Sequence, residues 1–200
     1  QPYESVWQQM QDYTAGRTPK SADQLWLLEH YPIYTLGKRD QRYLLPTASK
    51  IPWITSDRGG EITYHGPGQL VAYLLLDLRR RQMGIKDLVH QLEQTLIDFL
   101  ATQHLQAHRR AGMPGIYVND AKIASLGLRV RRGCSYHGAS LNVNMDLSPF
   151  TDIAPCGYPD LQVTQMANFN ASIQVENILH PLKTAFEKQF NLISQEAGEQ

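Results

Sequence analysis

Two cysteines and one lysine are the residues of this chain best suited to nucleophilic chemistry. A thiol has an unperturbed pKa of about 8.5, so a cysteine nucleophile needs a nearby cation to ionise near neutral pH. Cys156 lies in the run Pro155-Cys156-Gly157-Tyr158-Pro159, where prolines and a glycine exclude an ordinary strand or helix. The sequence therefore places this thiol on a loop, which suits a nucleophile better than it suits core packing.

Cys134 is the rival nucleophile, because Arg131 and Arg132 stand directly before it and could favour a thiolate. Lys122 could serve Cys156 both as the cation and as a proton carrier. The sequence alone does not show that these two residues, 34 positions apart, meet. From the residues by themselves, either cysteine could be the nucleophile.

Lys122 and His137 both align with the apolar side of a predicted strand, because side chains alternate across a strand. The partners of Lys122 on that side are Ala124, Leu126, Leu128 and Val130. The partners of His137 are Ala139, Leu141, Val143 and Met145. Such a lysine either extends its ammonium to solvent or is held for chemistry. A hydrogen-bonded core histidine is the simplest interpretation of His137.

A glycine-rich segment, RGGEITYHGPGQL, begins at Arg58. Glycine permits positive φ and close approach to the main chain, which either a bound ligand or a tight turn would need. The spacing matches neither a Walker A loop nor GxGxxG, so phosphate binding is not indicated.

The elements that must position these groups alternate between helices and strands. Apolar spacing predicts amphipathic helices over Tyr3–Tyr13, Gly84–Leu105 and Val175–Phe190, with Pro181 splitting the last one or marking its first turn. Strands are expected in two segments of Asp23–Gly37, over Ile51–Arg58, as a buried central strand over Leu70–Leu78, and as three runs within Gly112–Pro159, while Lys38–Pro52 reads as a loop. These elements predict an α+β fold with one mostly antiparallel or mixed sheet.

Composition bounds the class of protein. The 200 residues suit a single domain, 1–200, and 42% apolar with 19% charged residues is typical of a globular protein. Zero formal net charge gives no support to a nucleic-acid or membrane-surface role, and no apolar run approaches the ~20 residues of a membrane span. His104 and His108 lack a third ligand nearby in sequence, so no metal site is expected. The chain begins with Gln1, so a short N-terminal piece is expected to be missing, and no signal peptide is visible. Two cysteines make no disulfide framework, which favours free thiols in the cytoplasm.

Three long motifs together resemble the lipoyl(octanoyl) transferase family of lipoate biosynthesis. They are RGGEITYHGPGQL, KIASLGLRVRRGCSYHGASLNVNMDL and PCGY, in that order, and the resemblance covers roughly residues 22 to 166. It implies a fold like the catalytic domain of biotin and lipoate protein ligases, an α/β sandwich in the broad sense. It also implies transfer of an octanoyl group from acyl carrier protein to a lysine of lipoyl domains and of the glycine-cleavage H protein.

The resemblance also implies roles for individual residues. Cys156 would carry the acyl thioester and Lys122 would lower its pKa, which leaves Cys134 without a role. The implied acyl-binding residues are Arg58, Gly59, Gly60, Glu61, Ile62, Thr63, Tyr64, His65, Ser125, Leu126, Gly127, Gly138, Ala139 and Ser140.

Because a thioester donor is already activated, no ATP, metal or redox cofactor is expected. Basic patches at Arg79–Arg81 and Arg129–Arg132 could steer acidic carrier domains. Two alternatives remain: an ATP-dependent lipoate or biotin ligase, and a non-catalytic module that binds an acylated or lipoylated partner.

Overall fold

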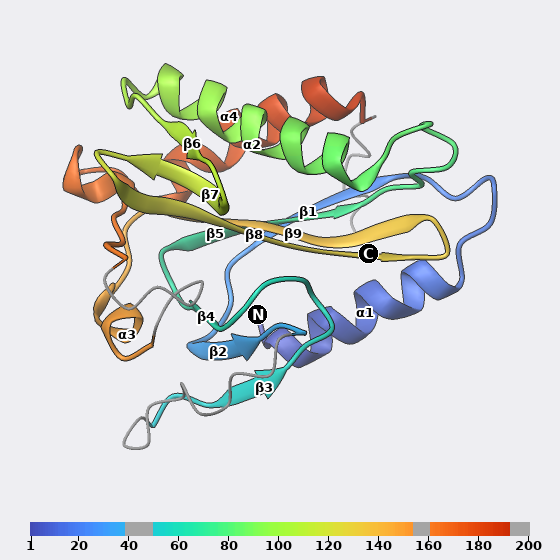
Figure 1. Cartoon of the computed structure of the whole chain (residues 1–200), viewed down its shortest axis with the longest axis horizontal. Helices are drawn as coiled ribbons and strands as arrows, with labels where there is room; N and C mark the ends of the chain where they lie inside the picture. Colours follow the sequence, from blue (N-terminus) through green and yellow to red (C-terminus); the bar gives the residue numbers. More distant parts are fainter. Residues whose placement is uncertain (39–49, 154–160, 193–200) are drawn as a thin grey trace.

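A six-stranded antiparallel sheet forms the centre of the molecule in the computed structural model, which describes residues 1–38, 50–153 and 161–192 (Figure 1). Its strand order is β1-β5-β9-β8-β7-β6. The strands are β1 (Gln24–Leu28), β5 (Gln69–Leu75), β6 (His108–Arg110), β7 (Met113–Val118), β8 (Ala121–Arg131) and β9 (Cys134–Asn142). The predicted antiparallel or mixed sheet is therefore confirmed.

The two faces of this sheet are covered by different elements (Figure 1). Helices α2 (Ile85–Thr102) and α4 (Val175–Phe190) lie on one face. On the other lie α1 (Tyr3–Ala15) and a three-stranded sheet of order β3-β2-β4, made by β3 (Trp53–Thr55), β2 (Ile33–Leu36) and β4 (Thr63–His65). In this smaller sheet β2 runs parallel to β3 and antiparallel to β4.

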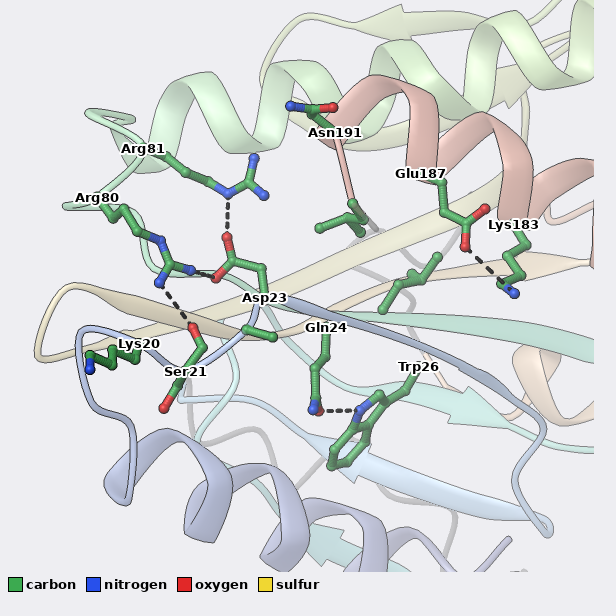
Figure 2. A pocket seen from close by; sticks show the side chains of 13 residues that line it. Lys20, Ser21, Asp23, Gln24, Trp26, Arg80, Arg81, Lys183, Glu187 and Asn191 are labelled. Atoms are coloured by element: carbon green, nitrogen blue, oxygen red, sulfur yellow. Dashed lines mark hydrogen bonds and ion pairs between the residues drawn. The ribbon is translucent and has the colours of Figure 1, made fainter. Parts of the chain in front are cut away.

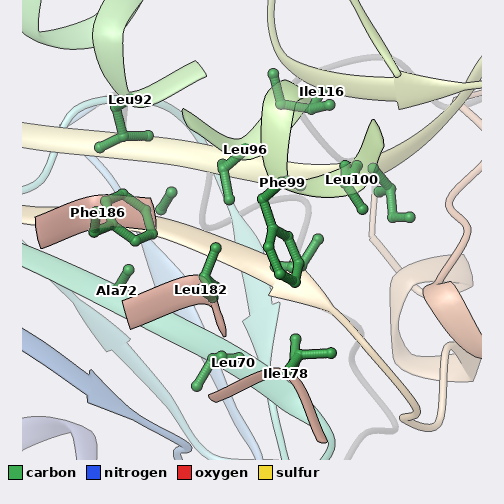
Figure 3. Close-up of a cluster of buried hydrophobic side chains, with 14 of the residues drawn as sticks. Leu70, Ala72, Leu92, Leu96, Phe99, Leu100, Ile116, Ile178, Leu182 and Phe186 are labelled. Atoms are coloured by element: carbon green, nitrogen blue, oxygen red, sulfur yellow. The ribbon is translucent and has the colours of Figure 1, made fainter. Parts of the chain in front are cut away.

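Strand β5 is buried on both faces, as its continuous apolar sequence predicts. Leu70, Ala72, Leu74 and Leu76 pack against α2 and α4 in the main core. Figure 3 shows Leu92, Leu96 and Phe99 of α2 meeting Ile178, Leu182 and Phe186 of α4 above this strand. The alternate residues Val71, Tyr73 and Leu75 pack with Val6 and Met10 of α1 instead.

The three predicted helices are all present, and local signals explain their ends. The Asp87 carboxylate accepts a hydrogen bond from the Gly84 backbone N–H at 3.1 Å, which satisfies a donor at the start of α2. Asn191, in the left-handed conformation, ends α4. Pro181 lies inside α4, which remains one helix, so the expectation that it splits the helix or marks its first turn is wrong. The short helices α3 (Ser148–Thr151) and η3 (Met166–Asn168) complete the described elements.

The strand expected over Ile51–Arg58 is shorter than predicted, since β3 covers only Trp53–Thr55. Of the predicted loop over Lys38–Pro52, residues 39–49 lie outside the described residues. None of the helices in the described ranges is long and apolar enough to cross a membrane.

Candidate active site

The three segments predicted to bind substrate come together around one narrow cavity of about 60 Å³. Two of them are direct neighbours: Ser125 pairs with Ser140, Leu126 with Ala139 and Gly127 with Gly138 across β8 and β9. All six of these residues line the cavity. The third segment, which starts at Arg58, lines it from the side of the smaller sheet.

Small side chains on one face of the large sheet leave the space for this cavity. In the rows across the sheet, Val71 of β5 faces Ser140, and Tyr73 faces Gly138. Residue 138 must be glycine, because a Cβ there would lie 2.0 Å from the Ala72 carbonyl oxygen. The small side chains of Ser125 and Ser140, and the absence of side chains at Gly127 and Gly138, thus leave this part of the sheet face open.

Arg58 holds the glycine-rich segment in place. Its side chain is buried, and its guanidinium donates to Thr35 Oγ1 at 2.9 Å and to the carbonyl oxygens of Gly59 at 3.0 Å and Glu61 at 2.7 Å. The Gly59 N–H in turn donates to the Leu128 carbonyl at 2.9 Å. Arg58 therefore joins β2, the segment and, through Gly59, the large sheet, and its contacts are those of a residue that shapes the cavity wall.

The four glycines of this segment have different reasons to be glycine. Gly60 and Gly68 have φ of 85° and 83°, a conformation that favours glycine. Gly59 and Gly66 are instead in close contact, since a Cβ on Gly66 would lie 2.3 Å from Tyr64 Oη.

Most of the predicted binding residues line the cavity, with two exceptions. Gly59 lines a neighbouring surface groove, and Tyr64 packs with Tyr34 and Phe150 in a separate cluster. The other residues of the Arg58 segment that line the cavity are Arg58, Gly60, Glu61, Ile62, Thr63 and His65.

Lys122 is buried, and a β-bulge decides which way it points. One step on β7, from Ile116 to Tyr117, matches two on β8, from Ala124 to Lys122, so Ile123 is the extra residue. Ile123 and Ala124 both pack in the main core, whereas Lys122 Nζ lies 5.6 Å from the centre of the Tyr117 ring. The expectation that Lys122 shares the face of Ala124 is therefore wrong, because the bulge breaks the alternation.

The backbone of Lys122 pairs with a segment that returns from later in the chain. Its N–H donates to the Gln162 carbonyl at 2.8 Å, and its carbonyl accepts from the Thr164 N–H at 2.9 Å. Cys156, the predicted nucleophile, lies outside the described residues, as do residues 154–160 as a whole. Gln162 and Thr164, which follow residues 154–160 in the chain, are thus hydrogen-bonded directly to the Lys122 backbone.

Cys134 lies at the opposite end of β8 from Lys122, opposite Arg131. Arg131 is nine residue steps along β8 from Lys122, which at ~3.3 Å per residue amounts to about 30 Å. Cys134 is a free thiol, buried, and burial raises its pKa despite the nearby Arg17 and Arg79. Its surroundings therefore disfavour the thiolate that a nucleophile needs.

His137 is hydrogen-bonded and buried as predicted, but it points away from the predicted face. Its φ of 59° breaks the strand alternation, so both Tyr136 and His137 bond to Asp57. The His137 Nε2 to Asp57 Oδ1 distance is 3.0 Å. Burial would raise the pKa of Asp57, but hydrogen bonds from His137, Tyr136 and Trp7 outweigh it and bring that pKa to about 2.

The sequence motifs missed Tyr3, which lines the cavity, and Asp57, which is bonded to the lining residue His137. Asp57 accepts from Trp7 Nε1 at 2.8 Å, and the Tyr3 hydroxyl donates to Ser56 Oγ at 2.9 Å. These two bonds fix α1 against the segment that leads into Arg58, and Tyr3 lines the cavity. An aspartate directly before a glycine-rich motif was a visible signal, but its partners lie about 50 and 80 residues away.

A larger surface cavity of about 540 Å³ lies elsewhere and contains none of the predicted site residues (Figure 2). At its edge the Asp23 carboxylate forms ion pairs with Arg80, with 2.7 Å between Nη2 and Oδ1, and with Arg81, with 2.6 Å between Nε and Oδ2. Arg17 forms a third ion pair with Asp23. Burial would raise the pKa of Asp23, but hydrogen bonds from the Asp77 N–H and from Arg81 lower it. Arg80 and Arg81 of the predicted carrier-steering patch are therefore engaged in a structural ion cluster.

Comparisons with known proteins identify the family of this chain. The model of the lipoyl protein ligase A/B catalytic domain matches residues 2–187. An octanoyltransferase of Thiobacillus denitrificans is 54% identical over 186 residues, which cover 93% of this chain and 85% of that relative. An octanoyltransferase of Legionella pneumophila is 51% identical over 190 residues, 94% of each chain. In fold, a putative lipoate protein ligase from T. acidophilum superposes with a TM-score of 0.78 at 15% identity, covering 100% of this chain and 86% of that one.

Proposed function

The chain belongs to the octanoyltransferases of the lipoyl protein ligase A/B catalytic family and transfers octanoyl groups in lipoylation, and we propose that it does so through an acyl thioester on Cys156. The donor is octanoyl-acyl carrier protein. The acceptor is the ε-amine of a lysine on lipoyl domains and on the glycine-cleavage H protein. The reaction takes place in the cytoplasm, where a free thiol such as that of Cys134 is stable.

The observation that carries this proposal is the pairing of Ser125–Gly127 with Gly138–Ser140 under the Arg58 segment, beside Lys122. Ser125 lines the cavity and is three residues from Lys122 on the same strand, so we expect the reacting end of the cavity to be the one nearer Lys122. An acyl chain in the cavity would have its carbonyl at that end. The cavity is smaller than the ~300 Å³ of a typical ligand site, so we expect its walls to separate as the chain enters.

Chain connectivity favours Cys156 over Cys134 as the partner of Lys122. Cys156 precedes Gln162 by six residues, and six residues span at most about 20 Å. Gln162 is hydrogen-bonded to Lys122 itself. Cys134, in contrast, is held by strand register at about 30 Å.

The chemistry balances without a further reactant. In the first step the Cys156 thiolate attacks the donor carbonyl, an S–C bond forms, and the carrier thiolate leaves and takes up the proton that Lys122 accepted from Cys156. In the second step the acceptor amine attacks the same carbonyl, an N–C bond forms, and the S–C bond to Cys156 breaks. Lys122 removes the amine proton and returns it to the thiolate.

Intact-mass analysis tests the proposal. After incubation with octanoyl-acyl carrier protein and no ATP, we expect an octanoyl adduct that maps to Cys156 and disappears when a lipoyl domain is added. A requirement for ATP before any product forms would favour the ligase alternative. Binding without an adduct or product would favour the non-catalytic alternative.

A further inference from the structure

The neighbours of His65 determine which of its two ring nitrogens carries the proton. Its Nδ1 lies 2.7 Å from Gln69 Oε1, and Gln69 Nε2 donates to the Tyr64 carbonyl at 3.2 Å. A carbonyl oxygen only accepts, so this second contact fixes which end of the Gln69 amide is nitrogen. Gln69 Oε1 must then accept from His65, which carries its proton on Nδ1 and leaves Nε2 as a bare lone pair.

The same chain of amides reaches the backbone of Lys122. Gln69 Nε2 also donates to Asn142 Oδ1 at 2.9 Å, and Asn142 Nδ2 donates to the Thr164 carbonyl at 3.0 Å. The Thr164 N–H donates to the Lys122 carbonyl at 2.9 Å. The Gln69 and Asn142 side chains are buried. These buried hydrogen bonds, joined through the main chain of Thr164, therefore connect the His65 ring to the Lys122 backbone.

The lone pair of His65 is left for a ligand. His65 lines the cavity, and its Nε2 has no hydrogen-bond partner in residues 1–38, 50–153 and 161–192. The Tyr3 ring stacks on the His65 ring and the His30 ring meets it edge-on, each with a distance of 5.8 Å between ring centroids. Arg58 and His137 are the other charged or titratable groups that act on the pKa of His65. Burial, followed by His30, lowers the pKa of His65 to about 3, so its ring stays neutral.

We propose that His65 Nε2 accepts a hydrogen bond from the attacking amine of the acceptor lysine, with Gln69, Asn142 and Thr164 as the positioning residues that align it with Lys122. The inference rests on the proposed function. The acyl thioester carries only acceptor atoms, whereas a neutral amine carries N–H donors. One N–H proton goes to Lys122 as the N–C bond forms, and another is held by His65, which takes up no proton.

Nuclear magnetic resonance of the unmodified protein tests the tautomer without any substitution. The ring-nitrogen chemical shifts of His65 should report a protonated Nδ1 and an unprotonated Nε2 from pH 5 to pH 8. A proton on Nε2, or a His65 titration within that range, would overturn the proposal.

Single-turnover kinetics test the role. In His65→Phe, which keeps an aromatic ring beside Tyr3, we expect the Cys156 adduct to form and its transfer to a lipoyl domain to slow roughly tenfold, as loss of one hydrogen bond predicts. In Gln69→Glu, the carboxylate should raise the pKa of His65, so transfer should fall as pH decreases. Gln106→Glu, the same chemical change on the surface, is the matched control.

Equal slowing of adduct formation and of transfer in His65→Phe would overturn the proposal, and so would a Gln69→Glu pH profile identical to that of the control. Failure of the unmodified protein to form any adduct would instead reject the thioester function. The tautomer measurement would then still decide the state of His65.

Discussion

Ser125 and Ser140 face each other directly across β8 and β9, in the row of the sheet that also contains Val71. The pairing turns two sequence motifs into one cavity floor. It also orients the cavity, because Ser125 lies toward Lys122 and Gly127 lies away from it on the same strand.

The nucleophile can be identified by two matched substitutions. Cys156→Ser should abolish transfer, because an alcohol at this position lacks an accessible anion near neutral pH. Cys134→Ser should retain most of it, since Cys134 is buried at the far end of β8. Steady-state transfer to a lipoyl domain measures both, and an octanoyl adduct trapped on Cys134 would contradict the assignment.

Lys122 should control the reactivity of Cys156. In Lys122→Ala, loss of a nearby cation should return the thiol pKa toward about 8.5, so alkylation at pH 7 should slow. Lys122→Arg should not restore transfer, because guanidinium keeps its charge and cannot shuttle a proton. The pH dependence of alkylation is the readout, and an unchanged curve in Lys122→Ala would show that the lysine acts only on packing.

Acid should destabilise the fold through its buried histidines. Burial lowers the pKa of His30 to about 4 and that of His65 to about 3, and it also lowers the pKa of His137. The unfolded chain protonates His30 and His65 as pH falls below about 6.5 and the folded chain does not, so each of these two histidines lowers the free energy of unfolding by up to about 1.4 kcal/mol per pH unit. The lowered pKa of His137 acts in the same direction. Asp57 lowers the free energy of unfolding further only below about pH 4, because its pKa in the folded chain is below its ordinary value.

Urea unfolding at pH 7.5, 6.5 and 5.5 measures this effect. We expect the free energy of unfolding to fall steeply below pH 6.5. His30→Gln should flatten the dependence, whereas His90→Gln, at an exposed position on α2, should leave it unchanged. A wild-type stability that is constant between pH 7.5 and 5.5 would contradict the prediction, because it would show that these histidines take up protons equally in the folded and unfolded chains.

Local patterns predicted the elements of the fold, and long-range contacts decided the details of the site. The apolar spacing of α1, α2 and α4 and the continuous run of β5 were sufficient for their assignment. The bulge at Ile123 and the positive φ of His137 each break a strand alternation that sequence reading assumes. Asp57 was missed for a related reason, because its partners Trp7 and His137 meet it only in the folded chain.

The resemblance to a family supplied what local patterns did not, namely that Ser125–Gly127 and Gly138–Ser140 act together. Their cross-strand pairing brings the two segments together at one cavity, and their role in binding stays a prediction. The assignment of Cys156 remains a prediction, because that residue lies outside the described range.

The far end of the cavity should determine which lengths of acyl chain the protein accepts. Gly127 stands two residues beyond Ser125, about 7 Å farther from Lys122, and a Cβ there would lie 3.0 Å from the Gly59 carbonyl. Gly127→Ala should therefore slow acylation by an eight-carbon donor much more than by a two- or four-carbon donor. Ser125→Val, close to Lys122, should slow all three donors. The melting temperature is measured alongside, because equal losses across donors in Gly127→Ala together with a lower melting temperature would mean that the glycine only permits the Arg58 segment to pack on β8.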